Sequence, residues 1–291
     1  AEIEDRRGGA VKSEPCTVRS RGREMGQTTV AVTGASGQTG SILARKVAEA
    51  ADALGLRLRA IVRSPSSQAA LEAKFPVVKG QVMVNSFASE EALKEAFQGC
   101  DKLVILTSAK PKLVFTSLFG VIMRKYVLRQ EGARPSFYYL DGQEPKVVDW
   151  AVQKRQIDAA KAAGVKHIIL VGSMGGTKPD HFLNTMGGGN ILLWKRKAEK
   201  YLIASGMTYT IIHPGGLLPH PGMSAQSCEG GKRELTVGID DALMDGDAKH
   251  RVIPREDLAE VCLQCLRCPQ VENTSWDLTS KPEGEGKVWN K

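Results

Sequence analysis

Short apolar runs alternate with longer amphipathic segments through most of the chain. The runs that predict strands are 29–33, 56–62, 77–79, 102–107, 167–172 and 208–213. The segments whose apolar positions recur at helical spacing are 37–54, 67–74, 89–97, 147–163, 191–205 and 255–268. This alternation predicts an α/β fold, a doubly wound parallel sheet with helices on both faces.

The pattern weakens after His213. Residues 215–231 are rich in glycine and proline, and two further strands are predicted at 233–237 and 276–279. We expect this part, from about residue 214, to form a small lobe over the carboxyl edge of the sheet, where open α/β folds bind ligands. The expected domain spans 27–291. The polar, arginine-bearing segment 1–26 is predicted to be a disordered or partner-bound extension.

The first predicted strand runs directly into a glycine-rich turn. Gly34, Gly37 and Gly40 follow it, and an amphipathic segment comes after them. The first glycine permits a tight turn, the second lets the backbone approach phosphates, and the third lets the helix pack closely on the strand. The helix N-terminus then offers free N–H groups to an anion. The sequence therefore predicts a dinucleotide pyrophosphate site rather than a plain strand–turn–helix unit.

Composition and charge agree with a domain that binds a phosphate-bearing ligand. The chain has 291 residues, 42% of them hydrophobic, and a formal net charge of +8. Lysine and arginine are in excess in 57–79 and 161–200, on both sides of the predicted nucleotide site. A nucleotide accounts for this charge as well as a nucleic acid would, and no nucleic-acid-binding motif is present. No apolar run approaches the roughly 20 residues that span a bilayer.

Three of the six cysteines, Cys262, Cys265 and Cys268, form a Cys-x-x-Cys-x-x-Cys run. This spacing is also found at iron–sulfur sites. However, Cys262 lies on the apolar stripe of the predicted helix 255–268, Cys265 lies beside it, and no fourth cysteine is suitably near. We therefore expect these side chains to pack as small hydrophobic groups, and we expect no metal site.

Three motifs together resemble the atypical, NmrA-like short-chain dehydrogenases/reductases. They are the glycine trio, Val-Gly-Ser-Met-Gly-Gly at 171–176 and Trp-Lys-Arg-Lys-Ala-Glu at 194–199. Residues 28–284 are similar to a plant and algal group of NAD(P)-binding Rossmann proteins, many of them plastid proteins. The resemblance implies a Rossmann-like domain with bound NAD(P). The cofactor-binding residues it implies are Gly34, Ala35, Ser36, Gly37, Gln38, Thr39, Gly40, Thr107, Ser108, Ala109, Lys195, Pro214 and Gly215.

The same resemblance places Ser173 and Lys195 at the catalytic serine and lysine of the family. The family's catalytic tyrosine, four residues before the lysine, is replaced by Ile191, which cannot donate a proton. Two roles therefore stay open for each residue. Lys195 either contacts the ribose or is an exposed helix charge, and Ser173 is either a site residue or a strand-end cap. His213 and His181 are weaker candidates for proton transfer.

The end of the predicted second strand bears on the choice of cofactor. An acidic residue there would bind a free ribose 2′-hydroxyl, but the strand ends at Arg63, which is placed to meet a 2′-phosphate. We therefore expect NADP, with NAD and a solvated arginine as the alternative. Gln38 stands where relatives often have arginine, so one phosphate partner is missing. Gln81 follows Gly80 where relatives have aspartate, and it is the expected adenine contact.

An unexpected apolar segment, 113–123, is flanked by Lys110, Lys112, Arg124 and Lys125. It is too short to span a bilayer. It either covers the pocket or forms a core helix, or it presents a patch to a partner protein or a lipid surface.

Two functions fit these patterns. Ile191 and the apolar segment favour an NADP(H)-binding protein without catalysis, a redox sensor or structural subunit of an organellar complex. The phosphate loop and Lys195 also fit an NADP-dependent oxidoreductase that transfers a hydride to or from a small substrate. We expect a plastid location, with the cytoplasm as the alternative. We also expect contact with a protein complex or a membrane surface through 113–123 and the N-terminal extension.

Overall fold

The computed structural model describes residues 3–4, 10–11, 27–124, 129, 134–218 and 229–288. The predicted extension 1–26 lies outside this set apart from two short strands, β1 (Ile3–Glu4) and β2 (Ala10–Val11), which pair antiparallel. Residues 219–228, in the predicted glycine- and proline-rich region, also lie outside it.

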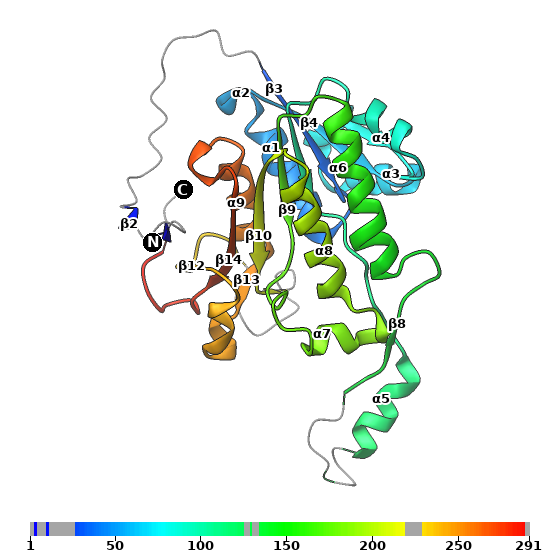
Figure 1. Cartoon of the computed structure of the whole chain (residues 1–291), viewed down its shortest axis with the longest axis vertical. Coiled ribbons are helices and arrows are strands. Elements are labelled where there is room, and N and C mark those ends of the chain that lie inside the picture. Colours follow the sequence, from blue (N-terminus) through cyan, green and yellow to red (C-terminus); the bar gives the residue numbers. More distant parts are fainter. Residues whose placement is uncertain are drawn as a thin grey trace.

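Ten strands of the described chain form one mostly parallel sheet (Figure 1). They are β3 (Thr28–Thr33), β4 (Leu56–Val62), β5 (Val82–Val84), β6 (Lys102–Ile105), β9 (His167–Val171), β10 (Thr208–Pro214), β11 (Gly216–Leu218), β12 (Leu235–Gly238), β13 (Val252–Pro254) and β14 (Thr274–Ser280). The order across the sheet is β11-β13-β14-β10-β9-β6-β3-β4-β5, with β12 antiparallel to β14. From β3 the chain builds first toward β5 and then, from β6, in the other direction. The switch point between β3 and β6 is where such sheets bind ligands.

Helices cover both faces of this sheet (Figure 1). They are α1 (Gln38–Glu49), α2 (Ala51–Leu54), α3 (Pro65–Lys74), α4 (Glu90–Phe97), α6 (Gln153–Ala162), α7 (Phe182–Thr185), α8 (Ile191–Ala204) and α9 (Arg255–Cys265). Successive residues of β3 pack on opposite faces of the sheet. Val30 and Val32 pack with residues of α1 and α9, whereas Ala31 packs with residues of α4 and α6. This division follows from the pleat of a strand, and it confirms the predicted doubly wound fold.

The predicted strand 77–79 is wrong. Pro76–Val78 forms a 3-10 turn, and the strand is β5, which pairs with the end of β4. Proline at the first position of the turn fixes a helical φ, and Gly80, with a φ of +77°, then redirects the chain. The short apolar run beside proline therefore forms a turn, and the pairing strand begins at Val82, five residues after the predicted start.

Several other elements differ from their predictions in their bounds or in the type of helix. The predicted helix 37–54 is interrupted at Ala50, which separates α1 from α2. The first part of the predicted helix 147–163 is a π-helix, Lys146–Val152, that continues into α6. Strand β6 ends at Ile105, two residues before the predicted end. The π-helical turn matters below because it presents a buried carboxylate at the edge of the sheet.

An arm, which we define as the described residues 110–124, 129 and 134–138, projects from the body of the domain (Figure 1). Strand β7 (Lys112–Leu113) pairs antiparallel with β8 (Phe137–Tyr138), and helix α5 (Phe115–Ile122) lies beyond this pair. No residue of α5 is buried, so the alternative of a core helix is wrong. No helix within the described ranges has the length and hydropathy needed to cross a membrane.

Candidate nucleotide-binding site

The turn between β3 and α1 leaves no room for side chains at its glycines. Gly34 has a φ of +70°, and a Cβ there would lie 2.8 Å from the backbone of Leu106, in the loop after β6. A Cβ on Gly40 would overlap the carbonyl oxygen of Gly34. A Cβ on Gly37 would come to 3.0 Å from the same oxygen, which already accepts the Gly37 N–H. The turn is therefore a cradle of backbone against backbone, which lets peptide groups approach a ligand closely.

The first turn of α1 is open to an anion. Gly37 is its N-cap, no side chain caps the helix, and no acidic residue lies in the first turn. Ser36 and Gln38 are exposed at the turn, whereas Thr39 and Gly40 are buried beneath it. Uncapped N–H groups and the positive end of the helix dipole favour a phosphate here. The predicted loop residues therefore fit a dinucleotide pyrophosphate.

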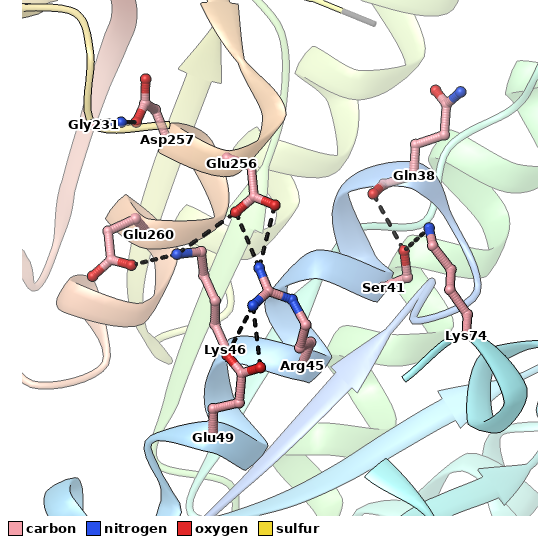
Figure 2. A network of polar contacts seen from close by, with 10 residues as sticks. All are labelled: Gln38, Ser41, Arg45, Lys46, Glu49, Lys74, Gly231, Glu256, Asp257 and Glu260. Carbon is pink, nitrogen blue, oxygen red and sulfur yellow. Dashed lines mark hydrogen bonds and ion pairs between the residues drawn. The ribbon is translucent and has the colours of Figure 1, made fainter. Parts of the chain in front are cut away.

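An ion-pair network fixes α1 against α9 (Figure 2). Arg45 pairs with Glu49 at 2.9 Å within α1 and with Glu256 of α9 at 3.2 Å. Lys46 pairs with Glu260 of α9 at 2.7 Å, and both of these side chains are largely buried. Breaking such a buried pair would leave an uncompensated charge, so the network holds α1, and with it the open N-terminus, in one position.

The carboxyl end of β4 carries a group of donors that the sequence analysis recognised only in part. Arg63 is exposed, and no hydrogen bond or ion pair ties its side chain to any described residue. Ser64 caps α3 by accepting the Ser67 N–H at 3.2 Å, and its hydroxyl lies 2.9 Å from that of Ser66 and 3.0 Å from that of Ser67. Arg63 precedes these three hydroxyls directly in the sequence, and a guanidinium, hydroxyls and a helix N-terminus are groups that suit a phosphate. The available signal was the Ser-Pro start of α3, which is typical of a helix N-terminus.

The Gln81 side chain forms a hydrogen bond within its own loop. Its Nε2 donates to the carbonyl oxygen of Val77 at 2.9 Å, and its backbone N–H donates to that of Val78. The side chain therefore already has a partner, and its contact with adenine stays a prediction.

Lys195 is buried at the edge of the sheet. Its Nζ forms an ion pair with Oδ1 of Asp149 at 2.8 Å, and the two side chains are 9% and 0% exposed. The other oxygen of Asp149 accepts the Ala109 N–H at 2.9 Å. The alternative of an exposed helix charge is therefore wrong for Lys195. The missing signal was its partner, which a π-helical turn presents from a distant part of the chain.

Side chains from α6 hold the loop after β6 in place. The carbonyl oxygen of Thr107 accepts from Gln153 at 2.8 Å, and its hydroxyl accepts from Gln156 at 3.0 Å. The Ser108 hydroxyl donates to the Ala109 carbonyl oxygen at 3.5 Å. The backbone predicted to lie beside the ribose is therefore fixed at both Thr107 and Ala109.

The remaining predicted site residues lie at the ends of β9 and β10. The Ser173 hydroxyl donates to the carbonyl oxygen of Met174 at 3.0 Å. Ile191 is the first residue of α8, so the position of the family tyrosine offers only a hydrocarbon side chain. Pro214 is buried in β10, and a Cβ on Gly215 would overlap the Arg251 carbonyl oxygen.

Sequence reasoning missed Tyr139, which follows the arm. Its ring packs where a Cβ on Gly187 or Gly189 would lie, just before α8. Its hydroxyl is buried and has no hydrogen-bond partner among the described residues. Burial raises the pKa of Tyr139, and the charge of Asp149 raises it further. A tyrosine in a loop carried no spacing or motif that distinguished it.

His213 lies between two buried carboxylates. Its Nε2 is 3.2 Å from Glu199 of α8, and its Nδ1 is 3.2 Å from Asp277 of β14. Burial lowers the pKa of His213, but its contacts with Asp277 and Glu199 outweigh burial and raise the pKa to about 9. Asp277 also accepts the Asp241 N–H at 2.8 Å, and Asp241 accepts the Gly175 N–H at 2.6 Å. His213 is therefore a structural cation whose contacts reach the loop after β9.

His181 and the clustered cysteines also have structural surroundings. Nδ1 of His181 accepts the Leu183 N–H at 3.3 Å and caps α7, and burial lowers the pKa of His181. Cys262 and Cys265 are buried in α9, and burial raises the pKa of Cys262 to about 12. Their packing as small hydrophobic groups is confirmed. No cluster of His, Cys, Asp and Glu in the described part of the chain is arranged to hold a metal ion.

A family model described as NAD(P)H-binding matches residues 34–269. The chain belongs to this NAD(P)H-binding family. It is 44% identical over 267 residues to sanguinarine reductase from Eschscholzia californica, which covers 89% of this chain and 92% of that protein. It is also 44% identical over 258 residues to an uncharacterised chloroplastic protein of Arabidopsis thaliana, covering 89% of this chain and 71% of that protein.

The solved structure of a wide-type short-chain dehydrogenase/reductase from Veillonella parvula, in complex with NADP, shares the fold. Its TM-score is 0.54 at 13% identity, and the match covers 91% of this chain and 98% of that one. The predicted Rossmann-like fold, the NAD(P) cofactor and the resemblance to atypical short-chain reductases are confirmed. The chain is an NAD(P)-binding member of a reductase-like family that has chloroplastic relatives.

Proposed function

We propose that this protein is an NADP(H)-dependent reductase of a small acceptor. The observation that carries the proposal is the backbone cradle of Gly34 and Gly40, which faces an edge of the sheet that also holds a buried lysine, Lys195. Similarity to a reductase from Eschscholzia californica over nearly the whole of both chains supports it. When bound there, NADPH supplies a hydride.

The preference for NADP rests on the carboxyl end of β4. Arg63 and the hydroxyls of Ser64, Ser66 and Ser67 would hold the 2′-phosphate of the adenosine ribose. No acidic residue stands at this strand end to bind a free 2′-hydroxyl. NADPH gains these charge-assisted hydrogen bonds, and NADH does not.

The residues at the edge define which acceptors suit the site. Asp149 holds the Lys195 ammonium at 2.8 Å, so the lysine keeps a fixed position and a charge that is already compensated. Ile191 offers no proton. An acceptor that is itself cationic, such as an iminium ion, needs none, because a hydride added to carbon leaves the π-electron pair on nitrogen and gives a neutral amine. Carbonyl acceptors must take their proton from water or from another hydroxyl.

A titration of the purified protein with NADPH and NADH tests the cofactor assignment. NADPH is expected to bind about 10- to 100-fold more tightly than NADH, as one to two strong hydrogen bonds to a phosphate would give. Arg63→Ala should remove most of this difference and leave NADH binding unchanged. Arg57→Ala, an exposed arginine at the opposite end of β4, is the matched control. Equal affinities of the wild-type protein for the two nucleotides would refute NADP preference.

NADPH consumption with iminium and carbonyl acceptors tests the reaction. Turnover of iminium acceptors without comparable turnover of carbonyls is the expected result. The second candidate function, a nucleotide-binding redox sensor or structural subunit of a plastid complex, is favoured by Ile191. Tight NADPH binding without turnover of any acceptor would support that function over the reductase. The chloroplastic relative from Arabidopsis thaliana supports a plastid location for either function.

A further inference from the structure

Helix α5 exposes a continuous apolar face. Phe115, Leu118, Phe119 and Ile122 are spaced i, i+3, i+4 and i+7, so they lie along one side of the helix. Phe115 is 78% exposed, Phe119 is 70% exposed and Ile122 is 54% exposed. Large hydrophobic side chains scattered singly on a surface need no explanation, but four on one face of a projecting helix indicate a contact surface.

The opposite side of α5 faces its own arm. The Ser117 hydroxyl donates to the Val114 carbonyl oxygen at 2.6 Å and accepts the Ser136 N–H at 2.9 Å. Val114 and Ser136 are also joined through their backbones. The polar side of the helix is therefore held by the returning chain, and this arrangement turns the apolar face outward.

The sequence that leads into and out of this face is basic. Lys110 and Lys112 precede α5, Arg124 and Lys125 follow its apolar stretch in the sequence, and no Asp or Glu occurs between residues 102 and 130. A second copy of the chain would bring an identical basic rim against this one, which like-charge repulsion disfavours. An anionic lipid surface instead accepts apolar side chains between its headgroups and attracts lysine and arginine at the same depth.

We propose that α5 docks the protein on an anionic membrane surface, with Phe115, Leu118, Phe119 and Ile122 inserted among the lipid headgroups and acyl ends. The helix has eight residues and lies in the interface without spanning the bilayer. The arm leaves the domain immediately after Ala109, which binds Asp149, and returns immediately before Tyr139. Docking therefore brings the nucleotide-site edge of the domain toward the membrane. This inference does not depend on the proposed reductase activity.

Vesicle flotation of the full chain tests the proposal. The protein is expected to float with mixed phosphatidylcholine and phosphatidylglycerol vesicles, to float far less with pure phosphatidylcholine, and to lose binding as salt is raised. The double variant Phe115→Ser/Phe119→Ser should bind at least about tenfold more weakly, because two large apolar groups no longer insert. Ile203→Ser, which alters a partly exposed apolar residue on α8, is the matched control and should float like the wild type.

Unfolding curves and NADPH titrations separate a loss of membrane binding from a loss of folding. The double variant should keep the wild-type unfolding curve and NADPH affinity, since α5 contributes no buried residue. Wild-type protein that stays at the bottom of the gradient with anionic vesicles would overturn the proposal. So would flotation that the double variant leaves unchanged. The proposal would also be overturned if the wild-type protein does not bind vesicles but is a dimer, and the double variant is a monomer. That result would assign the apolar face to contact with a second copy of the chain.

Discussion

Replacing His213 by glutamine removes a buried cation whose contribution to stability can be worked out from its surroundings. The ordinary pKa of 6.5 rises to about 9 in the folded protein, because contacts with Asp277 and Glu199 outweigh the effect of burial. A shift of this size corresponds to about 3 kcal/mol at 1.36 kcal/mol per pKa unit. The folded pKa lies above the unfolded one, so this stability is fully present below pH 6.5 and is lost as the pH rises to about 9.

Urea unfolding followed at a series of pH values between about 6 and 9.5 measures this contribution. The part of the wild-type free energy of unfolding that His213 contributes should fall by about 3 kcal/mol across the range. His213→Gln should be less stable at neutral pH by about 3–5 kcal/mol, since Glu199 and Asp277 lose their buried cation. Unfolded Cys262 and Cys265 ionise at the upper end and lower stability in both proteins, because burial raises both thiol pKa values in the folded state. The difference between the two curves is therefore the quantity to compare, and it should shrink with rising pH.

His167 provides a control because its pKa is shifted in the opposite direction from that of His213. Burial, and then the charge of Lys102, lowers the pKa of His167 from 6.5 to about 4. This histidine is neutral in the folded protein above pH 6.5, and its effect on stability appears only as the pH falls below that value. His167→Gln should therefore keep the wild-type decline above neutral pH. A wild-type curve that is flat from about pH 7 to 9, or a His213→Gln curve parallel to it, would refute the reasoning.

Three further perturbations test other parts of the structure. Gly40→Ala places a methyl group against the Gly34 carbonyl and should weaken NADPH binding at least about tenfold in a fluorescence titration, whereas Gly164→Ala, with a φ of +80° and open space around it, should affect stability alone. Tyr139→Phe removes a buried hydroxyl without a described partner and should raise the free energy of unfolding by about 1 kcal/mol, so a loss in thermal unfolding would contradict that picture. Asp149→Asn leaves the Lys195 ammonium buried without its anion and should cost about 3 kcal/mol in urea unfolding, most of which the further change Lys195→Met should restore.

Local patterns of apolar and polar residues were enough to predict most elements of the fold. Leu56–Val62 is a strand with the predicted bounds, because its long apolar-rich run is flanked by a glycine and a capping serine. The run at 77–79 was too short for periodicity to distinguish a strand from a turn, and pairing with β4 selected the later segment instead. Where a segment is short, the neighbouring strand supplies the information that the sequence of the segment lacks.

In the candidate site, too, the features that depend on a short stretch of sequence were predicted, and those that depend on distant partners were not. The glycine cradle is encoded within seven residues, so its pattern was readable. The burial of Lys195 depends on Asp149, and the charge of His213 depends on Glu199 and Asp277, each contributed by a separate element. Such partners meet only when the chain folds, and no spacing in the sequence indicates them. The direction of α5 likewise depends on the hairpin at its base rather than on its own apolar pattern.

The two parts of the proposed nucleotide site differ in how freely their residues can be exchanged. At Gly34 and Gly40 the atoms in contact are peptide groups, so any larger residue must move the chain itself. At the end of β4 the side chain of Arg63 is exposed and Ser66 lies on the solvent side of its helix, so exchanges there disturb no core packing. If the proposed site is right, exchanges at Arg63 and Ser66 would change the preference between the two nicotinamide coenzymes and leave the glycine turn as it is.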